Sequence, residues 1–501
     1  MTVFDSNSNG SPNDKIWHSW DPHPWKHPWL SYENLSRIKT FSKEVVERDK
    51  EFMSNCDNKT LRYGFCGNMA NVMYNRAKPL IKDGAKITVY LHPQDTHYMS
   101  SPSWEEFDGV LPEGLLNVAA IENAGINLPN VPNIKQLPDF ANWPEWRSVY
   151  DKGKYSFLRD EDILQYEEYL SNIRTLIELN EMDANWCTQT SYLGYLANRP
   201  YLTSQSGGDL WLEASRNDKL GKLTRASYKY SRLILVSNPW SFAHARRYGY
   251  QNMVYLPKIL DEDVYKPGLG KERQKWESIS GGEFFILTTS RLDERNKGSS
   301  IGIEGFAKFS KDHPQARLVL IGWGNDKKTL AKKLEELDIT DRVIKLPISG
   351  KARLIDYLRS ADVFMDQFVL GYFGSAGLEA MACGLPVLGR IEHDQYDALC
   401  ETGAPPILNS GSIQQVQGNL EKLFSSKEIL QKTGNEHRQW FINNHGSERW
   451  KADYMAVLGA TAYSQSVNFE KTPLLEPLSQ QENDYHESGL RAAPATFDYG
   501  W

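Results

Sequence analysis

The 501-residue chain is long enough for two or more domains, and its 40% hydrophobic and 12% aromatic residues are ample for packed cores. Its formal net charge of −7 excludes a general electrostatic attraction to nucleic acid. Five cysteines without paired spacing, no apolar run as long as a membrane helix and no hydrophobic leader together predict a soluble protein of the reducing cytoplasm.

An N-terminal arm rich in tryptophan and proline is expected over residues 1–59. Residues 17–29, WHSWDPHPWKHPW, hold four tryptophans, three histidines and three prolines. The proline spacing forbids a regular helix there, so we expect the tryptophans to clamp an extended arm onto a domain surface or onto a partner. The histidines have no neighbouring cysteine or carboxylate cluster, which disfavours a metal site.

Strands and helices alternate from residue 60 onward. A strand over 61–67, a helix over 71–82 and a strand over 86–91 make one βαβ unit of a parallel sheet. Ligands bind at the carboxyl ends of such strands, and Gly67 lies at one of them. The later pattern predicts loops over 100–160, a helix over 161–180, a strand over 233–237 and a helix over 240–248.

Two further features of this half carry charge. Residues 200–209, PYLTSQSGGD, predict a strand that ends in a glycine turn with Asp209 at its tip. Residues 216–232 spread six basic side chains over a broad arc of a helix: Arg216, Lys219, Lys222, Arg225, Lys229 and Arg232. A solvated helix is one interpretation of this arc, and contact with a membrane or with lipid phosphates is the other.

The C-terminal half repeats the alternation more regularly. Residues 266–282 are charged and contain glycines, which suits an interdomain hinge. Apolar strands are expected near 283–290, 317–322, 342–347 and 362–365, with a helix between each pair. This order predicts a second doubly wound α/β domain. A last helix is expected over about 448–463, followed by a polar tail.

One stretch of this half, residues 371–388, predicts an anion site. Its sequence, GYFGSAGLEAMACGLPVL, reads as a glycine-rich turn, a short helix that begins near Ser375, and a buried strand. Gly374 and Gly377 permit close approach of backbone N–H groups to a ligand, and the positive end of the helix points to the same place. Glu379 lies one helical turn further on. A diphosphate with a carboxylate beside its ribose fits this pattern, although a packed helix–strand turn also does.

The series of motifs in the C-terminal half resembles the retaining glycosyltransferases of family four. It comprises TSRL and KG between residues 289 and 298, LVLIGWG (318–324), DRVIKL (341–346) and FG-x4-EAMA-x-G-x-PV (373–387). The resemblance covers residues 283–465 well and 60–265 faintly, and the combined series is much more specific than any one piece. It implies the GT-B fold, an α/β architecture of two facing Rossmann-like domains with a C-terminal helix that crosses back.

The resemblance also implies roles for individual residues. Arg291 and Lys297 match the pair that binds the donor diphosphate and stabilises the leaving group, with Arg295 as a substitute because the spacing is one residue longer than expected. The implied donor-binding set comprises the cradle residues Gly374, Ser375 and Ala376, the ribose-binding Glu379, Leu346 beside the base, and Gly67.

The chain departs from the family pattern at two positions. The first glutamate of the Glu-x7-Glu motif, which holds the donor sugar, falls at Gly371, so Asp366 and Gln367 from the preceding loop are candidates for the sugar contact. The family's His-Gly-x-Asp sequence is Ser206-Gly207-Gly208-Asp209 here. Asp209 remains available to orient or deprotonate an acceptor hydroxyl. Both departures bear on the identity of the donor more than on the fold.

The family's chemistry keeps the anomeric configuration and needs cations and water exclusion, so we expect neither a metal nor another cofactor. The leading hypothesis is transfer of a sugar from a nucleotide-sugar to a carbohydrate or lipid-linked acceptor in cell-envelope or exopolysaccharide assembly. The alternatives are a nucleotide-sugar epimerase or glycogen-type synthase of the same fold, and a non-catalytic nucleotide-sugar-binding scaffold. The expected location is cytoplasmic, with contact at the inner membrane face as an option.

The expected domains follow from these patterns. They are the arm (1–59), an acceptor-side Rossmann-like domain (60–265), the hinge (266–282), a donor-binding Rossmann-like domain (283–445), the crossing helix (446–465) and the tail (466–501).

Overall fold

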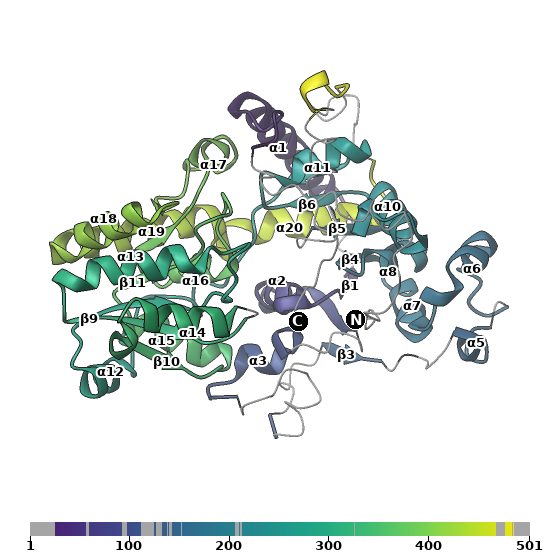
Figure 1. Cartoon of the computed structure of the whole chain (residues 1–501). Helices are drawn as coiled ribbons and strands as arrows, with labels where there is room; N and C mark the ends of the chain where they lie inside the picture. The colour runs from purple at the N-terminus through teal and green to yellow at the C-terminus, as the bar shows by residue number, and fades with distance from the viewer. Residues whose placement is uncertain are drawn as a thin grey trace.

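The computed structural model describes residues 26–56, 60–92, 98–111, 125–126, 133–137, 139, 143–151, 153–205, 210, 213–324, 326–466, 476–482 and 484. Two α/β bodies lie side by side in Figure 1, an N-terminal one in blue and teal and a C-terminal one in green. Asp209 with its glycine turn, and most of the Trp-rich segment 17–29, lie outside the described residues.

The N-terminal body is built on a seven-stranded sheet with the strand order β3-β2-β1-β4-β5-β6-β7. All its strand pairs are parallel. The central strands are buried on both faces, as their apolar residues require. The strands are β1 (Arg62–Cys66), β2 (Lys86–Leu91), β3 (Ile134–Gln136), β4 (Ala184–Thr188), β5 (Tyr201–Ser204), β6 (Ile234–Val236) and β7 (Met253–Tyr255).

Helices cover this sheet and connect its strands. In chain order they are α1 (Tyr32–Ser54), α2 (Val72–Lys82), α3 (Pro102–Glu106), α5 (Trp143–Trp146), α6 (Asp160–Tyr166), α7 (Ile173–Asn180), α8 (Ser191–Leu196), α10 (Lys219–Tyr230) and α11 (Ser241–Tyr248). The helix expected over 161–180 is broken between α6 and α7. Ser171 and Asn172 are weak helix formers, and the amide of Asn172 lies 3.3 Å from Nε2 of His92.

The C-terminal body has a six-stranded parallel sheet in the order β10-β9-β8-β11-β12-β13. This is the doubly wound order of dinucleotide-binding folds, in which the first and fourth strands of the domain are neighbours. Its strands are β8 (Phe284–Thr288), β9 (Ala316–Ile321), β10 (Val343–Leu346), β11 (Val363–Met365), β12 (Val387–Gly389) and β13 (Leu408–Asn409).

The helices of the C-terminal body are α12 (Arg273–Ser280), α13 (Ser299–Asp312), α14 (Lys327–Glu336), α15 (Lys351–Ser360), α16 (Ser375–Ala382), α17 (His393–Leu399), α18 (Ile413–Phe424), α19 (Lys427–His445) and α20 (Ser447–Ala462). The segment 266–282, expected as a hinge, contains α12. This helix is anchored to the body because its Trp276 is fully buried beside Phe285 of β8.

The predicted fold class is confirmed, because each body has a parallel, doubly wound sheet. A C-terminal helix crosses from the second body back to the first. The crossing helix is α20, which leaves α19 at Gly446 and packs Trp450, Tyr454 and Leu458 into the core of the N-terminal body. In Figure 1 it runs from the green body into the teal one.

Helix α1 is a second connection between the bodies. It lies within the segment expected as an extended arm, yet it is a 23-residue helix that packs against both α20 and α17. Its N-cap Ser31 accepts a hydrogen bond from the backbone of Asn34, which ends the proline-rich stretch. In the described part of the chain, no helix is long and apolar enough to cross a membrane.

Candidate active site

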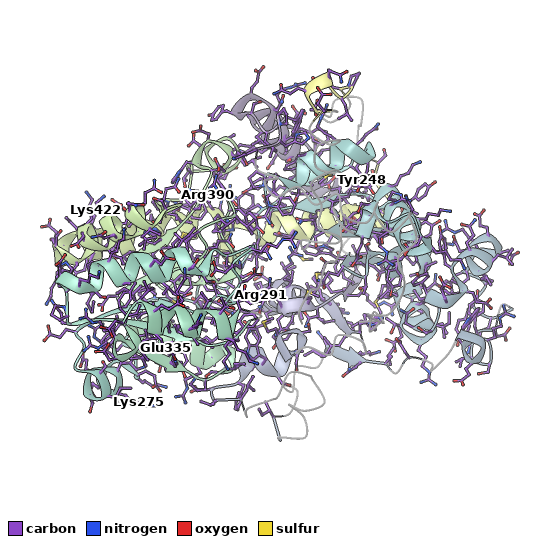
Figure 2. The ribbon with its side chains drawn as sticks, viewed as in Figure 1. Tyr248, Lys275, Arg291, Glu335, Arg390 and Lys422 are labelled. Carbon is purple, nitrogen blue, oxygen red and sulfur yellow. The ribbon has the colours of Figure 1, made fainter. Side chains whose placement is uncertain are left out.

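The candidate site lies where the C-terminal sheet reverses its strand order, between β8 and β11. In open α/β sheets, ligands bind outside the carboxyl ends of the strands at this point. The loop after β8 (residues 289–298) and the loop after β11 (residues 366–374) both begin there. Figure 2 labels Arg291, from the first of these loops, where the two bodies meet.

Asp293 organises the loop after β8. Its carboxylate accepts hydrogen bonds from the backbone and the side chain of Asn296, at 3.0 and 2.8 Å, and pairs with Arg291 at 2.6 Å. Burial alone would raise the pKa of Asp293, but the bonds from Asn296 and the guanidinium of Arg291 hold it below the usual value. The carboxylate therefore stays charged and fixes Arg291 in place.

Lys297 joins the two loops. Its ammonium donates to the side-chain oxygen of Gln367, and its backbone carbonyl accepts from Phe368 N–H at 2.7 Å. Burial lowers the pKa of Lys297, the nearby Asp366 opposes that shift, and the charge of Arg291 adds to it. Arg291 and Lys297 thus form one cationic cluster, whereas the Arg295 side chain is exposed.

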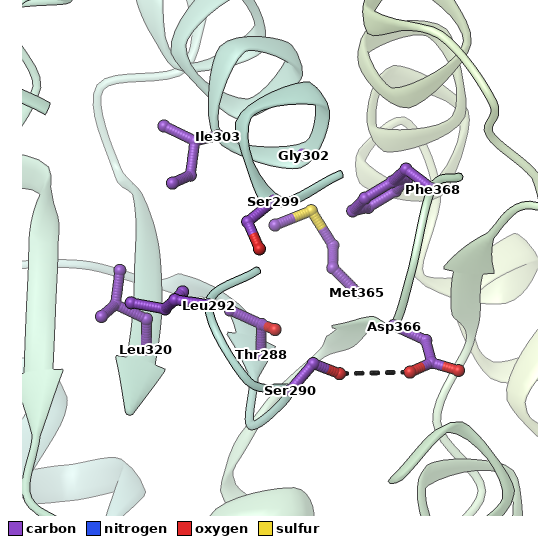
Figure 3. A pocket seen from close by; sticks show the side chains of 10 residues that line it. All are labelled: Thr288, Ser290, Leu292, Ser299, Gly302, Ile303, Leu320, Met365, Asp366 and Phe368. Carbon is purple, nitrogen blue, oxygen red and sulfur yellow. Dashed lines mark hydrogen bonds between the residues drawn. The ribbon is translucent and has the colours of Figure 1, made fainter. Parts of the chain in front are cut away.

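Asp366 sits against the start of α16. One carboxylate oxygen accepts from the backbone N–H of Gly374 at 2.8 Å, and the other accepts from the Ser290 hydroxyl at 3.1 Å, as Figure 3 shows. A Cβ on Gly377 would lie 2.5 Å from the same carboxylate, so glycine is required there by the approach of Asp366. The backbone N–H groups of Ser375 and Ala376 have no acceptor among the described residues and remain for an anion.

A small cavity lies behind Asp366. Its volume is about 20 Å³, which is room for about one water molecule. Its lining includes the polar side chains of Ser290, Ser299 and Asp366 and the apolar side chains of Leu320 and Phe368 (Figure 3). The cavity can hydrate the Asp366 carboxylate, but it is too small for a sugar.

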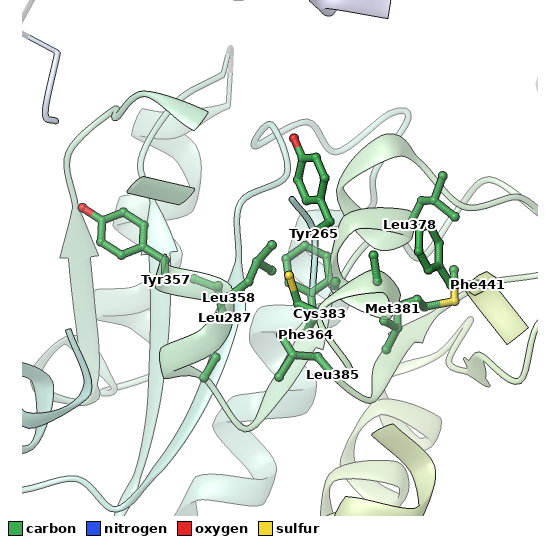
Figure 4. Close-up of a cluster of buried hydrophobic side chains, with 14 of the residues drawn as sticks. Tyr265, Leu287, Tyr357, Leu358, Phe364, Leu378, Met381, Cys383, Leu385 and Phe441 are labelled. Atoms are coloured by element: carbon green, nitrogen blue, oxygen red, sulfur yellow. The ribbon is translucent and has the colours of Figure 1, made fainter. Parts of the chain in front are cut away.

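Apolar packing fixes the direction of α16. Leu378 and Met381 on its inner face join a buried cluster with Phe364 of β11 and Phe441 of α19 (Figure 4). Gly384 follows the helix with φ near +80°, a left-handed conformation that glycine adopts without strain and that turns the chain into β12. The positive end of α16 therefore points from a rigid core toward Arg291 and Lys297.

Glu379 is buried in the second turn of α16 and is paired. Its carboxylate accepts from the Lys351 ammonium at 2.7 Å, and the two side chains are 9% and 11% exposed. Burial raises the pKa of Glu379. Burial alone would lower the pKa of Lys351, but the carboxylates of Glu379 and Glu105 raise it. Because the ion pair forms within the protein, a ribose contact at Glu379 must share the carboxylate with Lys351.

The remaining predicted contacts occupy different environments. Leu346 ends β10, is half-buried and packs against the apolar cluster that includes Leu378 of α16. Gln367 is fully buried, and its amide bonds to Lys297 and to the backbone of Tyr372. Gly67 is buried with φ near +81°, and a Cβ there would lie 1.6 Å from the carbonyl oxygen of Thr188. Glycine is therefore required at position 67, because β1 packs closely against the end of β4.

Two lysines of this region were not predicted as functional residues. Lys351 begins α15, where a cation is electrostatically unfavourable unless a carboxylate or another anion faces it. Lys258 follows β7 in the N-terminal body and reaches Ser375 of α16 at 2.5 Å. The sequence could have indicated these residues only as a lysine at a helix start and a lysine just past a strand end. Neither has a fixed sequence spacing to its partner on α16.

Three of the six cations in the basic segment 216–232 are bonded to other groups within the fold. Arg232 is buried against Asp49, Arg225 bonds to backbone carbonyls, and Arg216 pairs with Asp218. The exposed cations of α10 are Lys219, which lies 3.6 Å from Glu168, together with Lys222 and Lys229. The broad arc is thus reduced to three lysines on one helix.

Comparison with known proteins finds relatives of the C-terminal body. Residues 270–440 match the family described as glycosyl transferases group 1. Alpha-monoglucosyldiacylglycerol synthase of Acholeplasma laidlawii is 32% identical over 154 residues, which are 30% of this chain and 37% of that protein. N-acetyl-alpha-D-glucosaminyl L-malate synthase of Bacillus anthracis is 26% identical over 208 residues, 40% of this chain and 51% of that protein.

The fold is similar to that of the Anabaena protein HepE in complex with UDP and glucose. The TM-score is 0.56 at 14% identity, and the match covers 80% of this chain and 100% of HepE. The sequence matches, in contrast, span about a third to a half of the curated relatives. The chain therefore has the GT-B fold, and its residues 270–440 match the glycosyl transferase group 1 family.

Proposed function

We propose that the chain is a retaining glycosyltransferase, which moves a sugar from a nucleotide-sugar donor to a carbohydrate or lipid-linked acceptor. The observation that carries the proposal is the positive end of α16, with unpartnered N–H groups at Ser375 and Ala376, facing Arg291 and Lys297 at the strand-order reversal. The UDP bound to the similarly folded HepE supports a nucleotide-sugar as donor.

In this mechanism, the bond between the sugar and the nucleoside diphosphate breaks, and the acceptor hydroxyl forms its new bond on the same face of the sugar. The leaving phosphate takes the proton of that hydroxyl. Arg291 and Lys297 stabilise the charge that develops on the leaving diphosphate, because preorganised cations in a dry site are worth more than in water. Glu379 accepts from the ribose on the side of its carboxylate away from Lys351. Asp366 remains our candidate for sugar contact, and Asp209 for acceptor orientation, whereas the buried amide of Gln367 is bonded to Lys297 and to the backbone of Tyr372. No metal is assigned a role.

A transfer assay tests the proposal. The chain is incubated with UDP-, GDP- and dTDP-sugars and a panel of saccharide and lipid-linked acceptors, and release of nucleoside diphosphate is measured. Lys297→Ala should lower turnover about 10²–10³-fold, the usual effect of removing one transition-state contact. Arg295→Ala is the matched control and should retain activity. Donor consumption that is unchanged in Lys297→Ala would contradict the site assignment.

A non-catalytic nucleotide-sugar-binding protein is the second candidate. It is favoured by the carboxylate of Asp366, which already accepts from Gly374 in the cradle, and by glycine at position 371. This candidate predicts that nucleotide binds but that no donor is consumed with any acceptor of the panel.

We propose a cytoplasmic location in cell-envelope or exopolysaccharide synthesis, with α10 as the membrane-facing helix. The relative from Acholeplasma laidlawii is named for a glycolipid product, which supports a lipid-linked acceptor. Exposed Lys219, Lys222, Lys229 and Tyr230 suit an anionic bilayer surface. Sedimentation with phosphatidylglycerol vesicles should fall after replacement of the three lysines by glutamine, and vesicles of neutral lipid should bind neither protein.

A further inference from the structure

Lys258 brings a cation from the N-terminal body to the cradle of the C-terminal body. It follows β7 by three residues, and its ammonium donates to the hydroxyl of Ser375 at 2.5 Å. Ser375 is exposed and Lys258 is half-buried, so a solute can reach this contact. Ser375 is the first residue of α16, whose N–H groups the proposed function assigns to the donor diphosphate.

The backbone around Lys258 is held by both bodies. The carbonyl oxygen of Lys258 accepts from Nδ1 of His445 at 2.7 Å, and Leu260 N–H donates to the His445 carbonyl at 3.0 Å. The hydroxyl of Tyr454 on α20 donates to the Pro257 carbonyl at 2.7 Å. These bonds fix the segment at the junction of α19 and α20, so Lys258 is presented from a defined backbone.

The charges around Lys258 favour the binding of an anion. The first turn of a helix carries partial positive charge, which favours anions and disfavours an ammonium group. The charges that act most strongly on Lys258 are Glu379 of α16, Arg76 of α2, Lys351 of α15 and Glu105 of α3. Among these five side chains, Lys258 included, cations outnumber carboxylates by three to two.

Arg76 accentuates this excess. It is 5% exposed, donates to the Ser204 hydroxyl at 2.7 Å and lies over the ring of Trp186 at 4.8 Å. No carboxylate pairs with it among the described residues. Buried charge of one sign is costly unless it is compensated, and an anion bound beside Lys258 at the start of α16 would compensate both the ammonium group and the helix end.

We propose that Lys258 is a ligand of the donor's diphosphate, supplied by the N-terminal body, and that it couples donor binding to the contact between the two bodies. The inference rests on the proposed function for the identity of the anion. It goes beyond that function because it assigns a diphosphate ligand to the N-terminal body, whereas Arg291 and Lys297 both belong to the C-terminal body.

The binding should depend on pH around the pKa of Lys258. Burial lowers this pKa to about 8; Arg76 and Lys351 act in the same direction, while Glu379 and Glu105 oppose it. The ammonium is therefore lost as pH rises from 7 to 9, and affinity for a diphosphate should fall over that range. In Lys258→Arg, whose guanidinium stays charged, this fall should disappear.

Titration calorimetry tests the proposal. UDP, GDP and dTDP are titrated directly, the corresponding nucleosides are measured by competition with them, and inorganic phosphate is titrated separately. Lys258→Met should raise the Kd of the nucleoside diphosphate about 10- to 100-fold, as expected for loss of a charge-assisted hydrogen bond, and leave the nucleoside's Kd unchanged. Lys266→Met is the matched control: it changes an exposed lysine of the same connecting segment and should bind like the wild type.

Three outcomes would overturn the inference. Equal weakening of diphosphate and nucleoside would mean that Lys258 only shapes the cleft. Weakening confined to inorganic phosphate would assign the cation to an acceptor's phosphate. Diphosphate affinity that is unchanged in Lys258→Met would remove Lys258 from the site. Absence of nucleoside diphosphate binding in the wild type would contradict the proposed function itself, which separates the two failures.

Discussion

The paired side chains of Glu379 and Lys351 determine the chemistry on one side of the cradle. A buried carboxylate keeps its charge only if a cation or several hydrogen-bond donors face it. Lys351 supplies that cation at 2.7 Å, and it comes from α15 rather than from the motif that contains Glu379. The motif therefore predicts the position of the carboxylate. Its charge, however, is stabilised by Lys351, which lies 28 positions earlier in the chain.

The pair should show strong energetic coupling. Lys351→Met leaves Glu379 buried without its closest cation and should lower the free energy of unfolding by about 3–5 kcal/mol, measured by urea denaturation at pH 7. The double variant Lys351→Met with Glu379→Gln should lose less than Lys351→Met alone, because the uncompensated charge is gone. Additive losses in the double-mutant cycle would show that the two side chains are not coupled.

The sequence predicted the positions in the fold of residues that lie within one continuous motif. Gly374, Ser375 and Glu379 occupy the turn, the start and the second turn of α16 as the pattern requires. Lys351 and Lys258 were not predicted, because their proximity to α16 is created by the sheet order and by packing of the two bodies. Asp366 was expected to face the sugar, but its role as acceptor for Gly374 and Ser290 depends on side-chain geometry that spacing does not encode.

Helix α19 carries two histidines that must remain neutral. His437 and His445 are almost fully buried, and each places Nδ1 2.7 Å from a backbone carbonyl, of Thr433 and of Lys258 respectively. In both, Nε2 is buried without a hydrogen-bond partner. Burial lowers the pKa of each imidazole to about 4.

Acid should therefore destabilise the protein through α19. An unfolded histidine has a pKa of about 6.5, so below that pH the unfolded chain binds protons that the folded chain excludes. Each histidine should cost about 2 kcal/mol of unfolding free energy between pH 7 and pH 5. His437→Leu should show a smaller loss, whereas Gln439→Leu, at an exposed position of the same helix, should lose as much as the wild type. An unaltered pH dependence in His437→Leu would refute this assignment.

Elements were predictable where apolar periodicity was strong. The strands near 283–290 and 317–322 and the helix over 71–82 appear within a few residues of their expected bounds. The predicted helix over 161–180 is broken near Asn172, whose amide contacts His92. Helix α12 lies in a segment that we predicted as a hinge, because Trp276 is buried in the core of the C-terminal body. Local propensity cannot include such contacts.

At the scale of the whole molecule, the two bodies are fastened by α1, by α20 and by a strap of residues 98–111. The strap leaves the N-terminal body and pairs Val110 with Ser349 as an antiparallel bridge. Leu111 N–H donates to the Ile348 carbonyl at 2.8 Å, and Trp104 Nε1 donates to the Ser349 carbonyl at 2.8 Å. The strap therefore lies on the loop after β10, beside the proposed base-binding residue Leu346.

The strap's buried tryptophan should matter more than its surface ion pair. Trp104→Ala removes a side chain that is 5% exposed and should cost about 3–5 kcal/mol. Asp108→Ala breaks an ion pair with Arg353 whose carboxylate is 53% exposed, and should cost about 1 kcal/mol or less. Urea denaturation of both variants compares them directly, and equal losses would contradict the view that apolar packing fastens the strap.

The central claim is that the start of α16, with Lys297 and Arg291, holds the diphosphate of a nucleotide-sugar. A crystal structure of the chain soaked with UDP, GDP and dTDP in turn tests it most directly. We predict that at least one diphosphate binds with its oxygens within hydrogen-bond distance of the Ser375 and Ala376 N–H groups and of the Lys297 ammonium. Nucleotide bound elsewhere, or a cleft that stays empty with all three, would contradict the account.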